Sequence, residues 1–219
     1  MRGDGQLAWL NRLEAETGNL SAALSWLMDQ DRLDQAITFI WMTWRFWFLR
    51  GHLSEIARHG ETFLANGLQM ATHERALALS GAGFTLITNG EPDQAEPVFE
   101  QSLPLFRAAG DLLGEAMAAA TLGHVLASPQ NYDRAGELLE RAGNLLQEAS
   151  PGAHRGPEHV QYLLNVALVD NFLGQIQLGQ ADYGRAAELF TAGLDAARGS
   201  LDRFTILISL YDLALASQA

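Results

Sequence analysis

The sequence contains no cysteine and no lysine, and each absence excludes several kinds of chemistry. Without lysine the chain cannot form a Walker-type phosphate-binding loop, whose lysine reaches the β- and γ-phosphates, and it cannot form a Schiff base. Without cysteine it has no disulfide, no thiol nucleophile and no cysteine-ligated zinc site. Cysteine usage therefore says nothing about the cellular compartment.

Basic residues are also scarce, because 14 arginines face 26 acidic residues and leave a formal net charge of −12. The most apolar segment, residues 39–49, has only 11 residues and includes Arg45, whereas a membrane-spanning helix needs roughly 20 apolar residues. A chain this acidic is repelled by phosphate groups and by anionic lipid. The sequence therefore predicts a cytoplasmic protein that binds neither nucleic acid directly nor a membrane.

Helical periodicity runs along the whole chain, with no alternating strand pattern, so the sequence predicts an all-α fold. Mostly short connections between the predicted helices favour antiparallel neighbours. Eleven helices are predicted, over residues 6–16, 19–29, 33–50, 52–66, 72–89, 92–109, 111–128, 131–149, 157–179, 182–198 and 200–217.

Several residues at the predicted helix boundaries are of types that favour the start or the end of a helix. Asn19 is the expected N-cap of helix 19–29, and Pro92 and Pro157 suit first turns. Pro97 and Pro104 each remove a backbone donor inside helix 92–109 and are expected to bend it. Glycines stand where helices are expected to stop, at positions 51, 67, 90 and 110.

A short pattern of small and large residues recurs along the chain. Its three clear copies place Gly83, Gly123 and Gly174 in the first helix of a pair, and a fourth, weaker copy has Trp44 there. In the second helix an alanine comes first, and a phenylalanine or leucine follows one turn later. The glycine allows two antiparallel helices to approach closely, and the large side chain fills the space between them. The residues of the second helices are Ala95 and Phe99, Ala135 and Leu139, and Ala186 and Phe190.

This pattern resembles the tetratricopeptide repeat. Its copies are 39, 40 and 51 residues apart, against roughly 34 in the standard unit, which fits longer helices and an insertion at residues 150–156. The resemblance implies a right-handed α-superhelix, or α-solenoid, of antiparallel helix pairs. We expect an N-terminal helical segment at 1–32 and repeats at 33–67, 72–109, 111–149, 157–198 and 200–219, the last of them truncated.

A second resemblance covers residues 6–68. The strings QLAWLNRLEAE (6–16), NLSAALSW (19–26) and WRFWFLRGHLSE (44–55) are similar to the segment that follows the nucleotide-binding and winged-helix domains of large bacterial regulators. Those regulators are the AfsR-like, LuxR-type and MalT-like members of the STAND ATPase class, in which a helical-repeat region receives a signal. The resemblance implies that this chain is a fragment of such a transcriptional regulator.

The first helices of stacked pairs line the concave surface of a solenoid, so residues on one face of these helices are candidates for binding. On each first helix this face consists of the residues three before, one after and four after the glycine of the pattern, or Trp44 in the weaker copy. Aromatic side chains and one cation occupy it in the N-terminal half, and small or polar side chains in the C-terminal half. The candidate residues are Trp41, Arg45, Phe48, Ser80, Phe84, Ile87, His124, Asn171 and Gln175.

Each candidate also has a purely structural interpretation. Six aromatic residues surround helix 33–50, so most of them are expected in the core, and Trp41 or Phe48 alone would reach an accessible groove. Arg45 would form either a structural salt bridge or a ligand contact. His124 would be either a satisfied structural histidine or part of the binding face.

The sequence supports neither catalysis nor a metal or cofactor site. No two of the six histidines have helical metal-ligand spacing. Gly81 and Gly83 lie within a helix rather than after a strand, so they favour helix packing over nucleotide binding. A protein- or peptide-binding module is therefore the first hypothesis, and a small-molecule effector domain with a closed pocket near residues 41–48 is the second. A helical-repeat enzyme is a third hypothesis, and self-association through the terminal helix is a further expectation.

Overall fold

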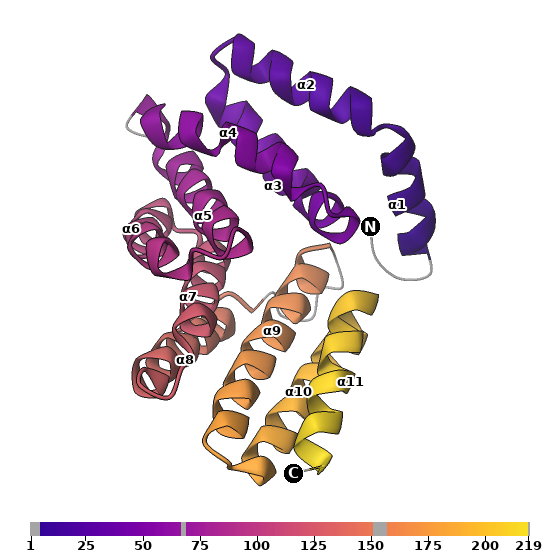
Figure 1. The fold of residues 1–219 in the computed structure, drawn as a ribbon, viewed down its shortest axis with the longest axis vertical. Helices are drawn as coiled ribbons and strands as arrows, with labels where there is room; N and C mark the ends of the chain where they lie inside the picture. The colour runs from indigo at the N-terminus through magenta and orange to yellow at the C-terminus, as the bar shows by residue number, and fades with distance from the viewer. Residues whose placement is uncertain (1–4, 67–68, 151–156, 219) are drawn as a thin grey trace. The chain divides into compact units, whose positions relative to one another are not determined.

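The computed structural model of the chain describes residues 5–66, 69–150 and 157–218 (Figure 1). Within these ranges the regular structure is helical throughout and contains no β-strand. The predicted all-α helical-repeat fold is therefore confirmed. Its helices are α1 (Gln6–Ala15), α2 (Thr17–Asp29), α3 (Leu33–Arg50), α4 (Leu53–Asn66), α5 (Thr72–Thr88), α6 (Pro92–Ala109), α7 (Leu112–Leu126), α8 (Tyr132–Glu148), α9 (Pro157–Gly179), α10 (Tyr183–Ser200) and α11 (Arg203–Gln218).

The predicted helix boundaries agree with the observed ones to within three residues, but the proposed cap of α2 is wrong. Asn19 lies inside α2, which already begins at Thr17. The amide of Leu20 donates to the carbonyl oxygen of Glu16 at 2.9 Å, so helical hydrogen bonding continues from the end of α1. Asn19 therefore has no free helix end to cap.

Three of the four expected helix-stop glycines have the predicted backbone conformation. Gly51, Gly90 and Gly110 have φ values of +75°, +82° and +71°, a region that glycine enters without steric strain. Position 67 lies outside the described residues. The helix α6 runs without interruption from Pro92 to Ala109 and includes both internal prolines.

The chain forms two compact units, residues 3–111 and 112–219. In the first unit α5 packs against α3, α4 and α6, and the expected N-terminal segment, α1 and α2, packs on α3. In the second unit α9 contacts α7, α8, α10 and α11, so one long helix forms the centre of the packing. Each unit is thus a stack of antiparallel helices in which neighbours share their buried faces.

The three glycines of the recurring pattern lie at tight helix crossings, as the pattern predicts. A methyl group added at Gly83 would stand 2.5 Å from the ring of Phe99, and one at Gly174 would stand 2.5 Å from the ring of Phe190. At Gly123 the nearest atoms would be Leu139 Cγ at 2.9 Å and the carbonyl oxygen of Ala135 at 3.0 Å. Only a residue without a side chain permits these approaches.

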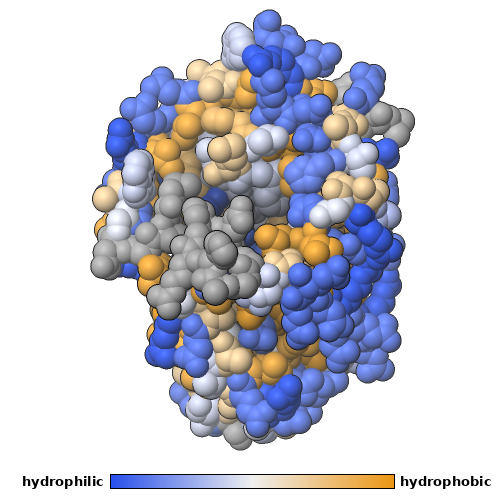
Figure 2. Space-filling view, turned by 180° about the vertical axis from the view of Figure 1, so that it is seen from behind, coloured by the Kyte–Doolittle hydropathy of each residue, from blue (hydrophilic) through white to orange (hydrophobic). Residues whose placement is uncertain are grey.

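Both units also expose apolar side chains. The face shown in Figure 2 is mostly hydrophilic but carries patches of hydrophobic residues. The large hydrophobic residues with more than a third of their surface exposed are Leu7, Trp9, Trp26, Met42, Tyr183, Leu201, Leu207, Leu210, Tyr211 and Leu215. Four of them belong to one helix, α11.

Replacing Gly83 by alanine should destabilise the protein, whereas replacing Gly81 in the same helix should not. The buried ring of Phe99 cannot move away from a methyl group at position 83 without disturbing the core, and such overpacking costs about 1–3 kcal/mol. At Gly81 a methyl group would meet no atom within 4 Å, so Gly81→Ala should stabilise α5 by up to about 1 kcal/mol. Urea unfolding of both variants measures the difference. Equal stabilisation by the two changes would show that the close crossing does not constrain the fold.

Candidate partner-binding surfaces

Aromatic side chains join α3 to α5 in the first unit. The ring centroid of Trp44 lies 5.5 Å from that of Trp41 and 5.1 Å from that of Phe84. Phe48 stacks on Trp44 at 6.4 Å with an interplanar angle of 19°. Trp41 Nε1 donates a hydrogen bond of 3.1 Å to the carbonyl oxygen of Leu77. We call Trp41, Trp44, Phe48 and Phe84 the aromatic seam.

The aromatic seam lies between core and surface. All four of its side chains are half-buried, whereas the neighbouring Phe46 and Trp47 have no exposed surface. The indole nitrogen of Trp47 donates to Thr43 Oγ1 at 2.7 Å, so its polar atom is satisfied inside the protein. Part of the cluster on α3 is therefore core, and the aromatic seam keeps part of its ring surface in solvent.

The other three candidates of the first unit differ in accessibility. Arg45 and Ile87 are half-buried, and Arg45 lies one helical turn from Trp41 on the same face of α3. Ser80 is 3% exposed, so the expectation that it lines an accessible surface is wrong for this residue. Its burial is shared by all its neighbours from 78 to 83 in the middle of α5.

In the second unit the candidate His124 stacks on an aromatic ring of the next first helix. Its ring centroid lies 4.1 Å from that of Phe172 on α9, with an interplanar angle of 15°. The residue as a whole is exposed, but loss of water around the ring lowers the pKa of His124 below its usual value of 6.5. His124 is therefore accessible at its edge and held in place by stacking.

Asn171 and Gln175 connect α9 to α11. Asn171 is 1% exposed, and its Nδ2 donates to Ser209 Oγ at 2.8 Å. Gln175 Nε2 donates to Asp212 Oδ2 at 3.1 Å. The predicted accessible position of Asn171 is wrong, because the neighbouring first helix covers it. We call Asn171, Gln175, Ser209 and Asp212 the polar seam.

These contacts share a sequence interval that no single residue reveals. The hydrogen-bonded partners of Trp41, Asn171 and Gln175 lie 36, 38 and 37 residues further along the chain. That interval is close to the repeat length, so these side chains reach the equivalent helix of the next repeat. Comparing the facing sides of successive repeats would have identified Leu77, Ser209 and Asp212 as their partners.

The second unit contains carboxylates in buried or half-buried positions. Asp212 is 5% exposed, and burial raises its pKa despite the opposing hydrogen bond from Gln175. Burial also raises the pKa of the half-buried Asp170 to about 6, although nearby Arg185 opposes the shift. Glu115 on α7, which is 2% exposed, pairs with Arg141 of α8. Each of these carboxylates is therefore either paired with an arginine of another helix or shifted by burial toward its protonated, neutral form.

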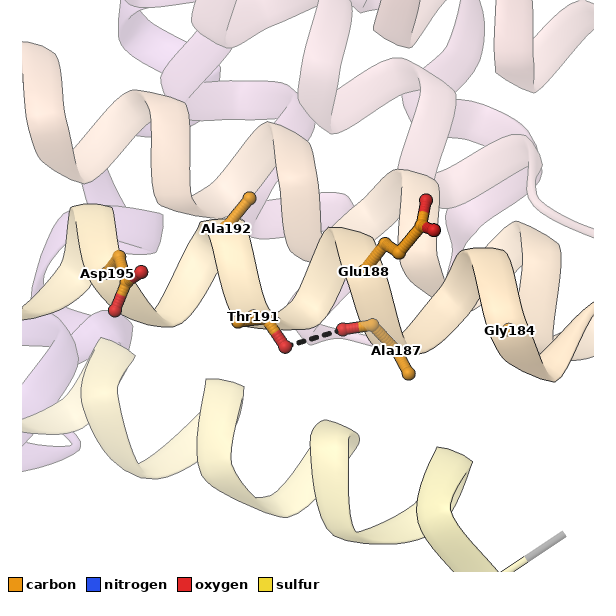
Figure 3. Close-up of a pocket in the computed structure, with 6 residues that line it drawn as sticks. All are labelled: Gly184, Ala187, Glu188, Thr191, Ala192 and Asp195. Carbon is orange, nitrogen blue, oxygen red and sulfur yellow. Dashed lines mark hydrogen bonds between the residues drawn. The ribbon is translucent and has the colours of Figure 1, made fainter.

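A shallow groove lies on the exposed surface of α10 (Figure 3). It is open to solvent, with a volume of about 530 Å³. Ala187 and Thr191 point toward α11 in this view. The lining residues are Gly184, Ala187, Glu188, Thr191, Ala192 and Asp195. None of them was among the sequence candidates, which all lie on first helices.

Two further properties concern the described part of the chain. No group of three histidine, aspartate or glutamate side chains there is arranged to hold a metal ion. None of the helices described combines the length and hydrophobicity that crossing a lipid bilayer requires.

A family model described as tetratricopeptide repeat matches residues 74–148, which span α5 to α8. No curated protein matches the sequence. The crystal structure of BtubC (BKLC) from P. vanneervenii is similar in fold, with a TM-score of 0.67 and 16% sequence identity over 95% of this chain and 83% of that chain. The chain therefore contains a tetratricopeptide-like domain within a helical-repeat fold. Repeats of this kind generally mediate protein–protein interactions, and folds of this type are typically non-enzymatic.

Replacing Asp170 by asparagine should stabilise the protein at neutral pH. Because the pKa of Asp170 rises from 3.8 to about 6 on folding, the folded state binds its proton more tightly, and stability falls as pH rises between these values. The penalty is complete above about pH 6, where the shift corresponds to at most about 3 kcal/mol. Asp170→Asn should therefore raise the melting temperature at pH 7.5 and change it little at pH 4.

The matched control is Asp195→Asn on α10, whose carboxylate is exposed and pairs with Arg198 one turn away. It should leave the melting temperature nearly unchanged at both pH values. A stabilisation by Asp170→Asn that is equal at pH 4 and pH 7.5 would contradict the assigned ionisation.

Proposed function

We propose that this chain is a protein- or peptide-binding module whose contact surface is the aromatic seam of the first unit. The observation that carries the proposal is the partial exposure of Trp41, Trp44, Phe48 and Phe84 along two packed helices. Their rings are held in place by one another, so little side-chain entropy is lost when a partner covers them. Tryptophan and arginine are also the residues that most often dominate binding energy at interfaces.

The chemistry of this surface favours an extended segment with apolar anchors. Exposed ring surface on α3 and α5 would be covered by apolar side chains of the partner. The net charge of −12 disfavours strongly acidic partners and nucleic acid. A neutral or basic peptide with aromatic or branched aliphatic residues fits these properties best.

The wider context that we propose is a bacterial signal-transducing transcriptional regulator of the STAND class. The support is the similarity of residues 6–68 to the segment that follows the ATPase and winged-helix domains of AfsR-like, LuxR-type and MalT-like proteins. In this setting the repeats would act in the cytoplasm and would transmit partner binding to an ATP-driven switch. Fold similarity alone carries no such role, so this part rests on the sequence.

Small-molecule sensing is the alternative role for the same domain. It requires an enclosed pocket lined by residues near 41–48. The groove that the structure describes is instead open and is lined by α10. The partly exposed rings of the aromatic seam support a protein or peptide partner, and an effector molecule is a distinguishable outcome of the test below.

Peptides selected from a random phage-displayed library on the immobilised chain should bind through the aromatic seam. Phe48→Ala should weaken the selected peptides by about tenfold or more, as expected for an aromatic anchor, and Trp41→Phe should weaken them less because it keeps a ring. Isothermal titration measures the affinities, and circular dichroism confirms that each variant is folded.

Trp26→Ala is the matched control, because Trp26 is a 52% exposed tryptophan on α2 of the same unit and lies outside the seam. Peptides that lose affinity through Trp26→Ala but not through Phe48→Ala would place the binding surface elsewhere. If no peptide is selected and metabolites instead raise the melting temperature, the effector role is favoured.

A further inference from the structure

The polar atoms of the aromatic seam narrow the kind of peptide that it can bind. Trp41 Nε1 is engaged, because it donates to the carbonyl oxygen of Leu77 at 3.1 Å. Trp44 Nε1 makes no hydrogen bond to any residue that the structure describes, and it is not among the buried polar atoms that lack a partner. The indole N–H of Trp44 therefore contacts solvent, and a partner that covers it has to supply an acceptor.

The backbone around the aromatic seam is already hydrogen-bonded. At the end of α3 the carbonyl oxygen of Phe48 accepts from the amide of Gly51 at 3.2 Å, and at the end of α5 that of Thr85 accepts from the amide of Asn89 at 3.0 Å. The other seam residues lie inside α3 and α5, where the backbone bonds to itself. A peptide N–H buried against this surface therefore loses its water without gaining a backbone acceptor.

Peptide conformations differ in how well they suit such a surface. A β-strand needs a neighbouring backbone to pair with its own N–H groups. An α-helix pairs its N–H and C=O groups internally, so it brings no free carbonyl for the indole N–H of Trp44. A polyproline II segment has no internal hydrogen bonds and exposes all its carbonyl groups, and proline has no N–H group to desolvate. A proline-rich segment therefore matches both properties of the surface.

The spacing of the rings also fits a polyproline II segment. Along α3 the ring centroids of Trp41 and Trp44 are 5.5 Å apart, and those of Trp44 and Phe48 are 6.4 Å apart. Phe84 widens the surface on α5, with its centroid 5.1 Å from that of Trp44. Residues two positions apart in polyproline II are separated by about 6.2 Å along the axis. Successive proline rings can therefore pack on successive aromatic rings, which is the usual mode of polyproline II recognition.

A carboxylate lies on the same face of α3, near the start of the helix. Asp34 precedes Trp41 by two helical turns, which is about 10 Å along the axis. Asp34 is exposed, and its carboxylate forms no ion pair or hydrogen bond with another residue of the described ranges. A basic residue three positions from the proline on Trp41 would reach it, because three polyproline II residues span about 9.3 Å. The net charge of −12 favours such a cation.

We propose that the aromatic seam binds a proline-rich segment in the polyproline II conformation, with a basic residue beside Asp34. This inference rests on the proposed function, because it names the partner of the same surface. One carbonyl oxygen of the segment accepts from Trp44 Nε1, and the apolar anchors are prolines with aliphatic residues between them. Binding loses little conformational entropy, because the rings hold one another in place and proline is already restricted.

The first test is the sequence of the peptides that the random library yields on the full chain. They should be enriched in proline and should carry a basic residue at one end of the proline segment. Peptides that depend on Phe48 but contain no proline would overturn this inference and leave the proposed function intact. Peptides that bind equally well to the Phe48→Ala variant would contradict the proposed function and this inference with it.

The second test uses a selected proline-rich peptide and removes the free donor. Trp44→Phe keeps an aromatic ring but has no N–H, so it should weaken binding about fivefold, the contribution of one hydrogen bond. Trp26→Phe makes the same change at a 52% exposed tryptophan outside the seam and should not alter the affinity. Isothermal titration measures both, and circular dichroism confirms that the variants are folded. A Trp44→Phe variant that binds as tightly as the wild type would refute the proposal.

The third test locates the basic residue of the peptide. Asp34→Asn should weaken the peptide about threefold at low salt, as expected for an exposed ion pair. It should not weaken a matched peptide in which glutamine replaces the basic residue. Asp93→Asn is the control, because Asp93 is an exposed carboxylate in the first turn of α6 and lies outside the seam. Equal losses for the two peptides would contradict the predicted position of the cation.

Discussion

The close approach of paired helices at three glycines is the constraint on which the fold depends. At Gly83 and Gly174 a phenylalanine ring occupies the space of a missing side chain, and at Gly123 a leucine and a backbone carbonyl do so. The paired helix covers only one face of each first helix at this short distance. Helices of the neighbouring repeats have to cover its remaining faces. The contacts between successive repeats follow from this geometry.

Those contacts change in chemistry between the two units. The first unit joins α3 to α5 through the rings of the aromatic seam. The second unit joins α9 to α11 through the hydrogen bonds of the polar seam. Half-buried rings leave surface that a partner can cover, whereas Asn171, Ser209 and Asp212 of the polar seam are buried and cannot be reached by one. This difference is why the binding surface is assigned to the first unit and not to the polar seam.

Helix positions and helix pairing could be predicted from the sequence because both depend on local patterns. Hydrophobic periodicity located every helix, and the spacing from Gly123 to Ala135 and Leu139 identified a pair that the structure confirms. Periodicity does not show which neighbour covers a given face. Asn171 was therefore expected at an accessible surface from its register relative to Gly174 alone, whereas it is buried and its amide nitrogen donates to Ser209 of the next repeat.

The polar seam has a consequence for how a helical array of this kind can change its length in evolution. Each hydrogen bond between α9 and α11 joins a donor in one repeat to its acceptor in the next. Duplicating or deleting a unit at this junction would separate donors from acceptors and leave buried amide and carboxyl groups without partners. Ring packing such as that between Trp44 and Phe84 does not need a matching hydrogen-bond donor or acceptor in the neighbouring repeat. Gain or loss of repeats is therefore better tolerated in the aromatic part of the array than next to α11.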